Sequence, residues 1–232
     1  MTATLDDPAR AQTARSADSR ARQIAAAAPL FASRGYSGVT VRELAKAADV
    51  NVAAISYHFG GKRGLYLAAL ERLMEEMRPV GGPVIQLIDD AFADGAPDRG
   101  TLAEIADAVV RHILTTMLSG GVPPWVTQTV LREFQEPTPD YRPMFDERVL
   151  PLHRAIRRLT SAALGLDPEG RDAVLASHAA MGQVMVFAAA RSVILEELDL
   201  RDFGPDDVER VIVMASRLFR NAIALDRDGE SA

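Results

Sequence analysis

Residues 40–62 read TVRELAKAADVNVAAISYHFGGK and contain the signals of two short helices separated by a tight turn. Thr40 and Glu43 have the spacing of a capping box, which predicts a helix that begins directly after Thr40. Asn51 is a favoured N-cap and predicts the start of a second helix. Gly60 predicts the end of that helix, since glycine adopts the left-handed conformation that closes many helices. Two helices joined in this way have the dimensions of a helix-turn-helix, whose second helix enters the major groove of DNA.

The second helix has two different faces when its residues are placed about 100° apart. Val52, Ile55 and Phe59 fall on one side and predict a buried stripe. Small residues around one tyrosine occupy the opposite side, with a histidine between the faces: Ala53, Ala54, Ser56, Tyr57 and His58. Small side chains allow close approach to base edges, and a tyrosine hydroxyl can bond a phosphate. Lys62 follows at the start of a further helix, where its charge and the free amides predict a phosphate contact.

The charge of the chain is unevenly distributed. The whole sequence has 26 basic and 32 acidic side chains, a net charge of −6, which alone argues against a nucleic-acid partner. Residues 10–63 are nevertheless basic, with nine cations against three anions. The cations are Arg10, Arg15, Arg20, Arg22, Arg34, Arg42, Lys46, Lys62 and Arg63. This segment is where a polyanion would be attracted, although a solvated charged surface would have the same composition.

The composition excludes several classes of site. The chain has 232 residues, of which 48% are hydrophobic and 25% charged, as in ordinary globular proteins. The absence of cysteine excludes disulfides, thiolate zinc sites and thiol nucleophiles. The four histidines have no i,i+4 pair, and no motif of a hydrolase, nucleotide-binding enzyme or metalloprotease occurs. We therefore expect neither an enzyme nor a bound cofactor or metal.

The ends and apolar stretches predict a cytoplasmic protein with no membrane association. Residues 1–20 lack the apolar core of a secretory signal. The longest uncharged stretch, residues 113–131, is interrupted by Gly and Pro pairs and is a poor candidate for a bilayer span.

Helical periodicity continues along the whole chain, and no segment has the pattern of a strand. We predict an all-α fold in four parts, with loops at residues 79–83, 95–100, 120–124 and 137–143. The parts are a disordered arm (1–18), a three-helix helix-turn-helix domain (19–64), a larger helical domain (65–226) and a C-terminal tail (227–232). Ser19 is the expected N-cap of the first helix, and Pro151 is expected to kink or split a helix over residues 143–164.

The segment from Thr40 to Lys62 resembles the DNA-binding domain of TetR-family transcriptional regulators. The similarity extends from about Arg20 to Leu70 and includes FASRGY at 31–36 and GLY at 64–66. Two residues depart from the family pattern. Asp49 replaces the usual glycine of the turn, and aspartate tolerates the left-handed conformation there. Ser56 stands where many members have an aromatic residue, which changes the operator that would be read.

The C-terminal part resembles CecR-type TetR regulators more distantly. LREFQEPTP at 131–139 and MGQ at 181–183 carry this resemblance, which implies an all-helical domain that dimerises and holds an effector. Independently, a helix expected at 168–198 is apolar around much of its middle, so it should be buried centrally or against a second subunit. Gly182 would allow close helix approach there, and a monomer's own core remains the alternative.

The predicted function is a ligand-responsive regulator, most simply a repressor that binds a palindromic operator in double-stranded DNA as a homodimer and is released by a small-molecule effector. The predicted DNA-binding residues are Arg20, Thr40, Arg42, Asn51, Ala53, Ala54, Ser56, Tyr57, His58 and Lys62. The candidate effector residues, each of which is alternatively plain core, are His112, Met117, Trp125, Phe134, Met144, His178 and Gln183. Two other hypotheses are an all-helical enzyme or small-molecule carrier with an incidental N-terminal domain, and a helical adaptor that binds protein or membrane.

Overall fold

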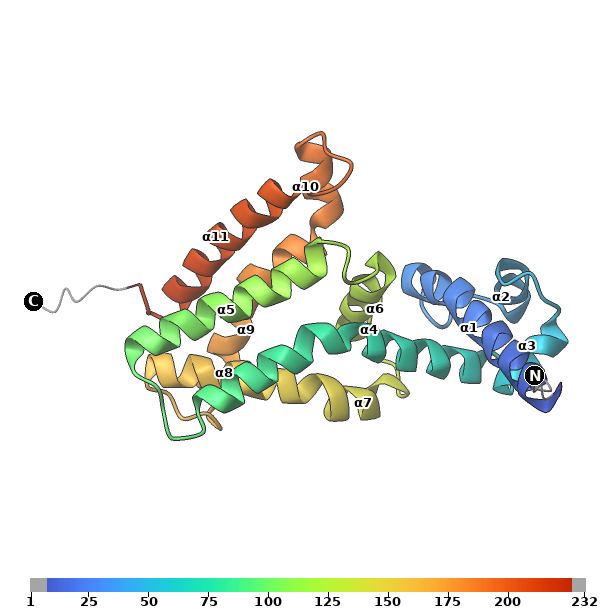
Figure 1. Ribbon diagram of the computed structural model, residues 1–232, viewed down its shortest axis with the longest axis horizontal. Helices are drawn as coiled ribbons and strands as arrows, with labels where there is room; N and C mark the ends of the chain where they lie inside the picture. The colour runs from blue at the N-terminus through green and yellow to red at the C-terminus, as the bar shows by residue number, and fades with distance from the viewer. Residues whose placement is uncertain (1–7, 227–232) are drawn as a thin grey trace, which may run out of the picture. The chain divides into compact units, whose positions relative to one another are not determined.

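The structure, a computed structural model, describes residues 8–226 and is helical throughout the regular elements of that range (Figure 1). The described chain forms two compact units. The N-terminal unit consists of residues up to Glu75 together with 128–140, and the C-terminal unit consists of 76–127 and the residues from Tyr141 onward. In this division the N-terminal unit includes residues 65–75 and the segment 128–140 besides the expected helix-turn-helix residues. The tail at 227–232 and the arm residues 1–7 lie outside the described residues.

The N-terminal unit is a small helical domain around an apolar core. Its elements are α1 (Pro8–Arg34), α2 (Val41–Ala47), α3 (Val52–Phe59), the first part of α4 (Lys62–Ala91) and the last part of α6 (Pro124–Gln135). Phe31, Leu44 and Ile55 are fully buried, one each from α1, α2 and α3. Burial of these three side chains fixes the two short helices against α1, since helices this short are unstable alone.

Helix α1 is longer than expected. It begins at Pro8, so residues 8–18, predicted to be a disordered arm, are helical. Ser19 is therefore not an N-cap. It lies within the helix, and its hydroxyl accepts a hydrogen bond from the Gln23 amide at 3.2 Å. Pro29 lies within α1 without ending it.

The turn between α2 and α3 has the predicted geometry. Asp49 has a φ of +52°, the left-handed conformation for which glycine is the usual residue. Gly60 is also left-handed, with a φ of +72°, and caps α3. The predicted buried stripe holds fully only at Ile55, which is completely buried. Val52 is 38% exposed, because it lies in the first turn of α3, and Phe59 is half-buried.

The C-terminal unit contains the remaining helices. They are the rest of α4, α5 (Arg99–Leu118), the start of α6, α7 (Tyr141–Met144), a π-helix (Phe145–Val149), α8 (Leu150–Leu164), α9 (Arg171–Ala189), α10 (Arg191–Glu197) and α11 (Pro205–Ala222). Helix α11 packs against α5 and α9, and α8 packs against α9 and α5. The π-helix precedes Pro151, which occupies the first turn of α8, so the predicted interruption near this proline is confirmed.

Helix α4 corrects the prediction of a loop at residues 79–83. It runs without a break through Pro79 and Pro83. Val80 and Val84 are almost completely buried, and this burial outweighs the weak helix propensity of the segment. Pro83 has no amide to donate to the Pro79 carbonyl, four residues earlier. The ring nitrogen Nε2 of His112 lies 2.8 Å from that oxygen and supplies the missing partner.

Helix α9 is the one helix of the described chain that is long and apolar enough to cross a membrane. A single such helix is weak evidence, because helices in the cores of soluble proteins have the same length and composition. In this structure α9 contacts α5, α8 and α11. The predicted helix at 168–198 is in fact two, since α9 ends at Ala189 and α10 begins at Arg191.

Candidate DNA-binding site

The outer face of α3 is exposed as the sequence predicts. Tyr57 is 81% exposed, and Ala53 and Ser56 are also exposed. Ala54 and His58 are half-buried at the edges of this face. Ile55 anchors the opposite side. The helix therefore presents a smooth surface with one projecting aromatic side chain, a shape that fits the major groove of a duplex.

Caps hold both helices of the motif at their N-termini. The Asn51 side-chain oxygen accepts a hydrogen bond from the Ala54 amide at 2.8 Å and so begins α3. At α2 the predicted capping box is present: the Glu43 amide donates to the Thr40 hydroxyl, and the Thr40 amide donates to the Glu43 carboxylate. Arg42, in the first turn of α2, is exposed. Thr40 and Asn51 therefore stabilise the starts of α2 and α3 in the free protein, independently of any contact with DNA.

Glu43 also links α2 to the last turn of α1. The Arg34 guanidinium donates to its carboxylate at 2.6 Å, and the Thr40 hydroxyl donates to the other carboxylate oxygen at 2.8 Å. The hydrogen bonds from Thr40, followed by that from Arg34, lower the pKa of Glu43 from 4.5 to about 2. An ionised carboxylate at neutral pH therefore fixes the start of the helix-turn-helix.

The depressed pKa of Glu43 predicts a pH-dependent contribution to stability. The folded protein holds Glu43 ionised, so the contribution is complete above the unfolded pKa of 4.5 and is lost as the pH falls toward 2. Replacement of Glu43 by Gln should lower the thermal midpoint at pH 6, and this deficit should shrink at pH 3. Calorimetry of both proteins at the two pH values measures it. A deficit that stays constant would mean that the charge of Glu43 contributes nothing.

Two cations next to α3 are positioned by aromatic rings. The Lys62 ammonium lies 4.4 Å from the centre of the Tyr36 ring, at the start of α4. The Arg20 guanidinium lies 5.1 Å from the centre of the Phe59 ring, at the end of α3. A cation over an aromatic face is attracted to it and loses part of its conformational freedom. Both cations are among the predicted DNA-binding residues: Arg20 is held at the C-terminal end of α3, and Lys62 is held at the start of α4.

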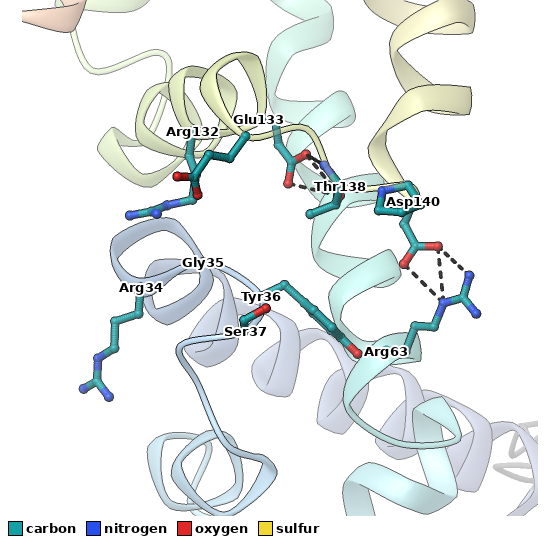
Figure 2. A pocket seen from close by; sticks show the side chains of 11 residues that line it. Arg34, Gly35, Tyr36, Ser37, Arg63, Arg132, Glu133, Thr138 and Asp140 are labelled. Atoms are coloured by element: carbon teal, nitrogen blue, oxygen red, sulfur yellow. Dashed lines mark hydrogen bonds and ion pairs between the residues drawn. The ribbon is translucent and has the colours of Figure 1, made fainter.

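Sequence reasoning missed a second group of polar residues in this unit. A pocket of about 560 Å³ lies between the end of α1, the start of α4 and the segment 132–140. Figure 2 shows Glu133 facing Thr138, and Asp140 facing Arg63 across the pocket. The LREFQEPTP motif was the available signal, but nothing in the sequence showed that it packs with the N-terminal helices.

The structure does not gather all the candidate effector residues. Phe134 lies in the N-terminal unit and is 47% exposed, whereas the other six belong to the C-terminal unit. His112 bonds the Pro79 carbonyl, Met117 is buried, and His178 is exposed with its Nδ1 2.8 Å from the Val174 carbonyl oxygen. Trp125, Met144 and Gln183 are half-buried.

Other residues line a pocket of about 540 Å³ beside α5 and α11 in the C-terminal unit. Arg111 and Glu209 form an ion pair of 2.6 Å at this pocket, and Phe203 supplies an aromatic wall. None of the seven candidate effector residues lines it.

Comparisons with known proteins agree with this arrangement. Residues 24–69 match the family model described as bacterial regulatory proteins of the tetR family. Residues 102–224 match the model of the C-terminal domain of the HTH-type transcriptional dual regulator CecR. The CecR regulator of Shigella flexneri is 27% identical over 201 residues, which cover 87% of this chain and 89% of the relative. The probable HTH-type regulator YttP of Bacillus subtilis (strain 168) is 55% identical over 53 residues, 23% of this chain and 24% of the relative.

A solved structure has the same fold. The crystal structure of AibR in complex with isovaleryl coenzyme A and operator DNA superposes with a TM-score of 0.59 at 20% identity, covering 87% of this chain and 98% of AibR. The two family matches together span most of the described chain, from the helix-turn-helix to the end of α11. The chain belongs to the TetR family of DNA-binding transcriptional regulators, with a C-terminal domain of the CecR type.

Proposed function

We propose that this protein is a cytoplasmic, ligand-responsive repressor that binds a palindromic operator as a homodimer and is released from it by a small-molecule effector. The observation that carries the proposal is the outer face of α3, where small residues surround the exposed Tyr57. Arg20, Arg42 and Lys62 supply positive charge beside this face. Phosphate contacts of this kind position a protein on DNA, and the residues in the groove read the bases.

Ala53, Ala54, Ser56 and Tyr57 are proposed to face the bases, with His58 at the edge of the groove. Arg20, Arg42 and Lys62 are proposed to contact phosphates. Thr40 and Asn51 are exposed N-caps of α2 and α3, and their side chains are proposed to contact the DNA backbone as well. These assignments follow from exposure and charge together.

A gel-shift assay with the promoter of the protein's own gene tests the proposal. The full chain at micromolar concentration and low salt is expected to retard this fragment, and an inverted repeat in the fragment should be required. Retardation that depends only on DNA length, or no retardation of any neighbouring promoter fragment, would contradict operator binding.

Replacing Lys62 by Ala should weaken DNA binding on every sequence by a similar factor. Each lost phosphate contact reduces the slope of log K against log salt by about one. The measurement is fluorescence anisotropy across a salt series on operator and random DNA. Arg148→Ala is a matched control, because Arg148 is an exposed cation of the C-terminal unit. An unchanged slope for Lys62→Ala would exclude its phosphate contact.

The homodimer is supported by apolar side chains that are exposed on α9 and α11. Leu175 and Val186 of α9 are 69% and 48% exposed, and Val213 and Met214 of α11 are 60% and 56% exposed. On α9 the exposed positions 175, 179, 182 and 186 follow helical spacing and include Gly182, at which an added Cβ would meet no other atom. Such stripes on two helices in contact suit a symmetric helical interface with a second copy.

The effector is proposed to act by population shift. The chain passes between the two units within α4, within α6 and directly before α7. An effector that binds one arrangement of these elements more tightly favours that arrangement. A thermal-shift screen of small apolar and aromatic compounds, with isovaleryl coenzyme A included because AibR binds it, would identify a ligand through the rise in midpoint. Midpoints that stay unchanged with every compound would argue against this effector class.

A further inference from the structure

Residues 128–140 form a segment of the N-terminal unit that the helix-turn-helix motif does not account for. This segment, here termed the clasp, comprises the last turns of α6 and the loop that follows. Polar side chains of the clasp bond the N-terminal helices, and Val130 of the clasp is buried, at 9% exposure. Its attachment therefore combines directional bonds with apolar burial.

Arg132 caps the C-terminus of α1. Its Nε donates to the Ala32 carbonyl at 3.1 Å, and its Nη2 donates to the Ser33 carbonyl at 2.8 Å. A cation at the last turn of a helix satisfies free carbonyls and interacts favourably with the helix dipole. Gly35 follows in the left-handed conformation, with a φ of +72°, and a Cβ there would be in ordinary contact with the Arg132 Nη1 at 3.4 Å.

Glu133 attaches the clasp to α4 and to its own loop. Its side chain is 2% exposed, and it accepts a hydrogen bond from the Tyr66 hydroxyl. The Thr138 amide donates to its second oxygen at 2.9 Å. Both carboxylate oxygens thus face donors. Burial, and then the bond to Glu133, raises the pKa of Tyr66 well above its ordinary value, so the phenol remains a donor. A third bond joins Asp140 to Arg63 at 2.6 Å.

The groups held by the clasp are the ones that place the DNA-binding residues. Arg34, in the same last turn of α1, bonds Glu43 of the α2 capping box. The Tyr66 ring packs against Tyr36 with ring centres 5.0 Å apart, and the Lys62 ammonium lies over the Tyr36 ring, 4.4 Å from its centre. Arg132 is therefore connected to α2 through the last turn of α1 and its Arg34. Glu133 is connected to Lys62 through the Tyr66–Tyr36 pair.

We propose that Arg132 and Glu133 are positioning residues for operator binding: through the clasp they fix the last turn of α1 and the Tyr66–Tyr36 pair, and thereby set α2 and Lys62 in the arrangement that fits DNA. The inference rests on the proposed function. A pocket of about 560 Å³ lies between the clasp and the ends of α1 and α4, and Arg132, Glu133 and Thr138 line it. Removal of either residue frees the clasp without changing any group that faces DNA.

The test compares the operator affinity of single-residue variants of the full chain. Glu133→Gln leaves one side-chain oxygen in place of two, so the Tyr66 hydroxyl and the Thr138 amide can no longer each donate to a separate oxygen. Its matched control is Glu136→Gln, the same charge change on an exposed residue of the clasp. Arg132→Met removes the cap, and Arg132→Lys retains the positive charge near the carbonyls as a partial rescue. Fluorescence anisotropy gives affinity and salt slope, and amide hydrogen exchange reports on 128–140 and α2.

Both Glu133→Gln and Arg132→Met are expected to weaken operator binding about tenfold with an unchanged salt slope, and to speed amide exchange in the clasp and in α2. Arg132→Lys should recover part of the affinity, and Glu136→Gln should match the native chain. A salt slope lower by about one for Arg132→Met would mean that Arg132 contacts phosphate directly, which overturns the positioning role. Native affinity in both variants would overturn it as well. Failure of the native chain to bind DNA would instead contradict the proposed function.

Discussion

Replacement of Ala53 by Phe is expected to abolish specific operator binding while the protein remains folded. Ala53 is exposed at the start of α3, so a larger side chain meets solvent in the free protein and base edges in the complex. The clash moves the helix out of the groove and removes several base contacts, each worth roughly 1–3 kcal/mol. We expect an affinity loss of about 100-fold or more, the equivalent of about 2.7 kcal/mol.

Anisotropy titration of the operator measures this loss, and the thermal midpoint controls for the fold. Ala25→Phe is the matched control, since Ala25 is an exposed alanine of α1 in the same unit. Retention of operator affinity within a few-fold of native by Ala53→Phe would show that this face of α3 does not enter the groove.

Replacement of Met214 by Glu is expected to convert the proposed homodimer into a monomer. Met214 is 56% exposed on α11, so the subunit itself should tolerate the change, but a carboxylate in an apolar interface would be desolvated without a partner. Light scattering should give 25.1 kDa instead of twice that mass. Two linked half-site contacts bind about 100- to 10,000-fold more tightly than one, and operator affinity should fall within that range.

The control for this prediction is Met214→Leu, which keeps the surface apolar and should remain dimeric. A Met214→Glu protein that stays dimeric would place the interface elsewhere. A monomeric variant that binds the operator with native affinity would instead contradict recognition by a dimer.

The sequence was sufficient to predict the helix-turn-helix because its determinants are local. Thr40, Asn51 and Gly60 fix helix ends through groups a few residues away, and the left-handed Asp49 follows from the turn between two such ends. Ile55 could be assigned to the core from periodicity alone, and it is completely buried. Val52 departs from the pattern because the first turn of a short helix is open to solvent.

Contacts between distant residues were not predictable from single positions. Pro79 and Pro83 indicate a loop locally, yet His112 of α5 satisfies the carbonyl that Pro83 leaves free and burial of Val80 favours the helix. Glu133 reads as a surface residue of an amphipathic helix, and its donor Tyr66 is 67 positions away in the chain. Candidate effector residues were chosen by residue type, which cannot distinguish a cavity wall from core.

Methylation interference on the operator is the most direct test that the exposed face of α3 reads the major groove. Methyl groups on guanine N7 project into the major groove, and those on adenine N3 project into the minor groove. N7 methylation at two clusters about one helical turn apart is expected to block binding, and N3 methylation between them should have little effect. Interference confined to N3 positions, or absent at N7 in both half-sites, would contradict major-groove recognition by α3.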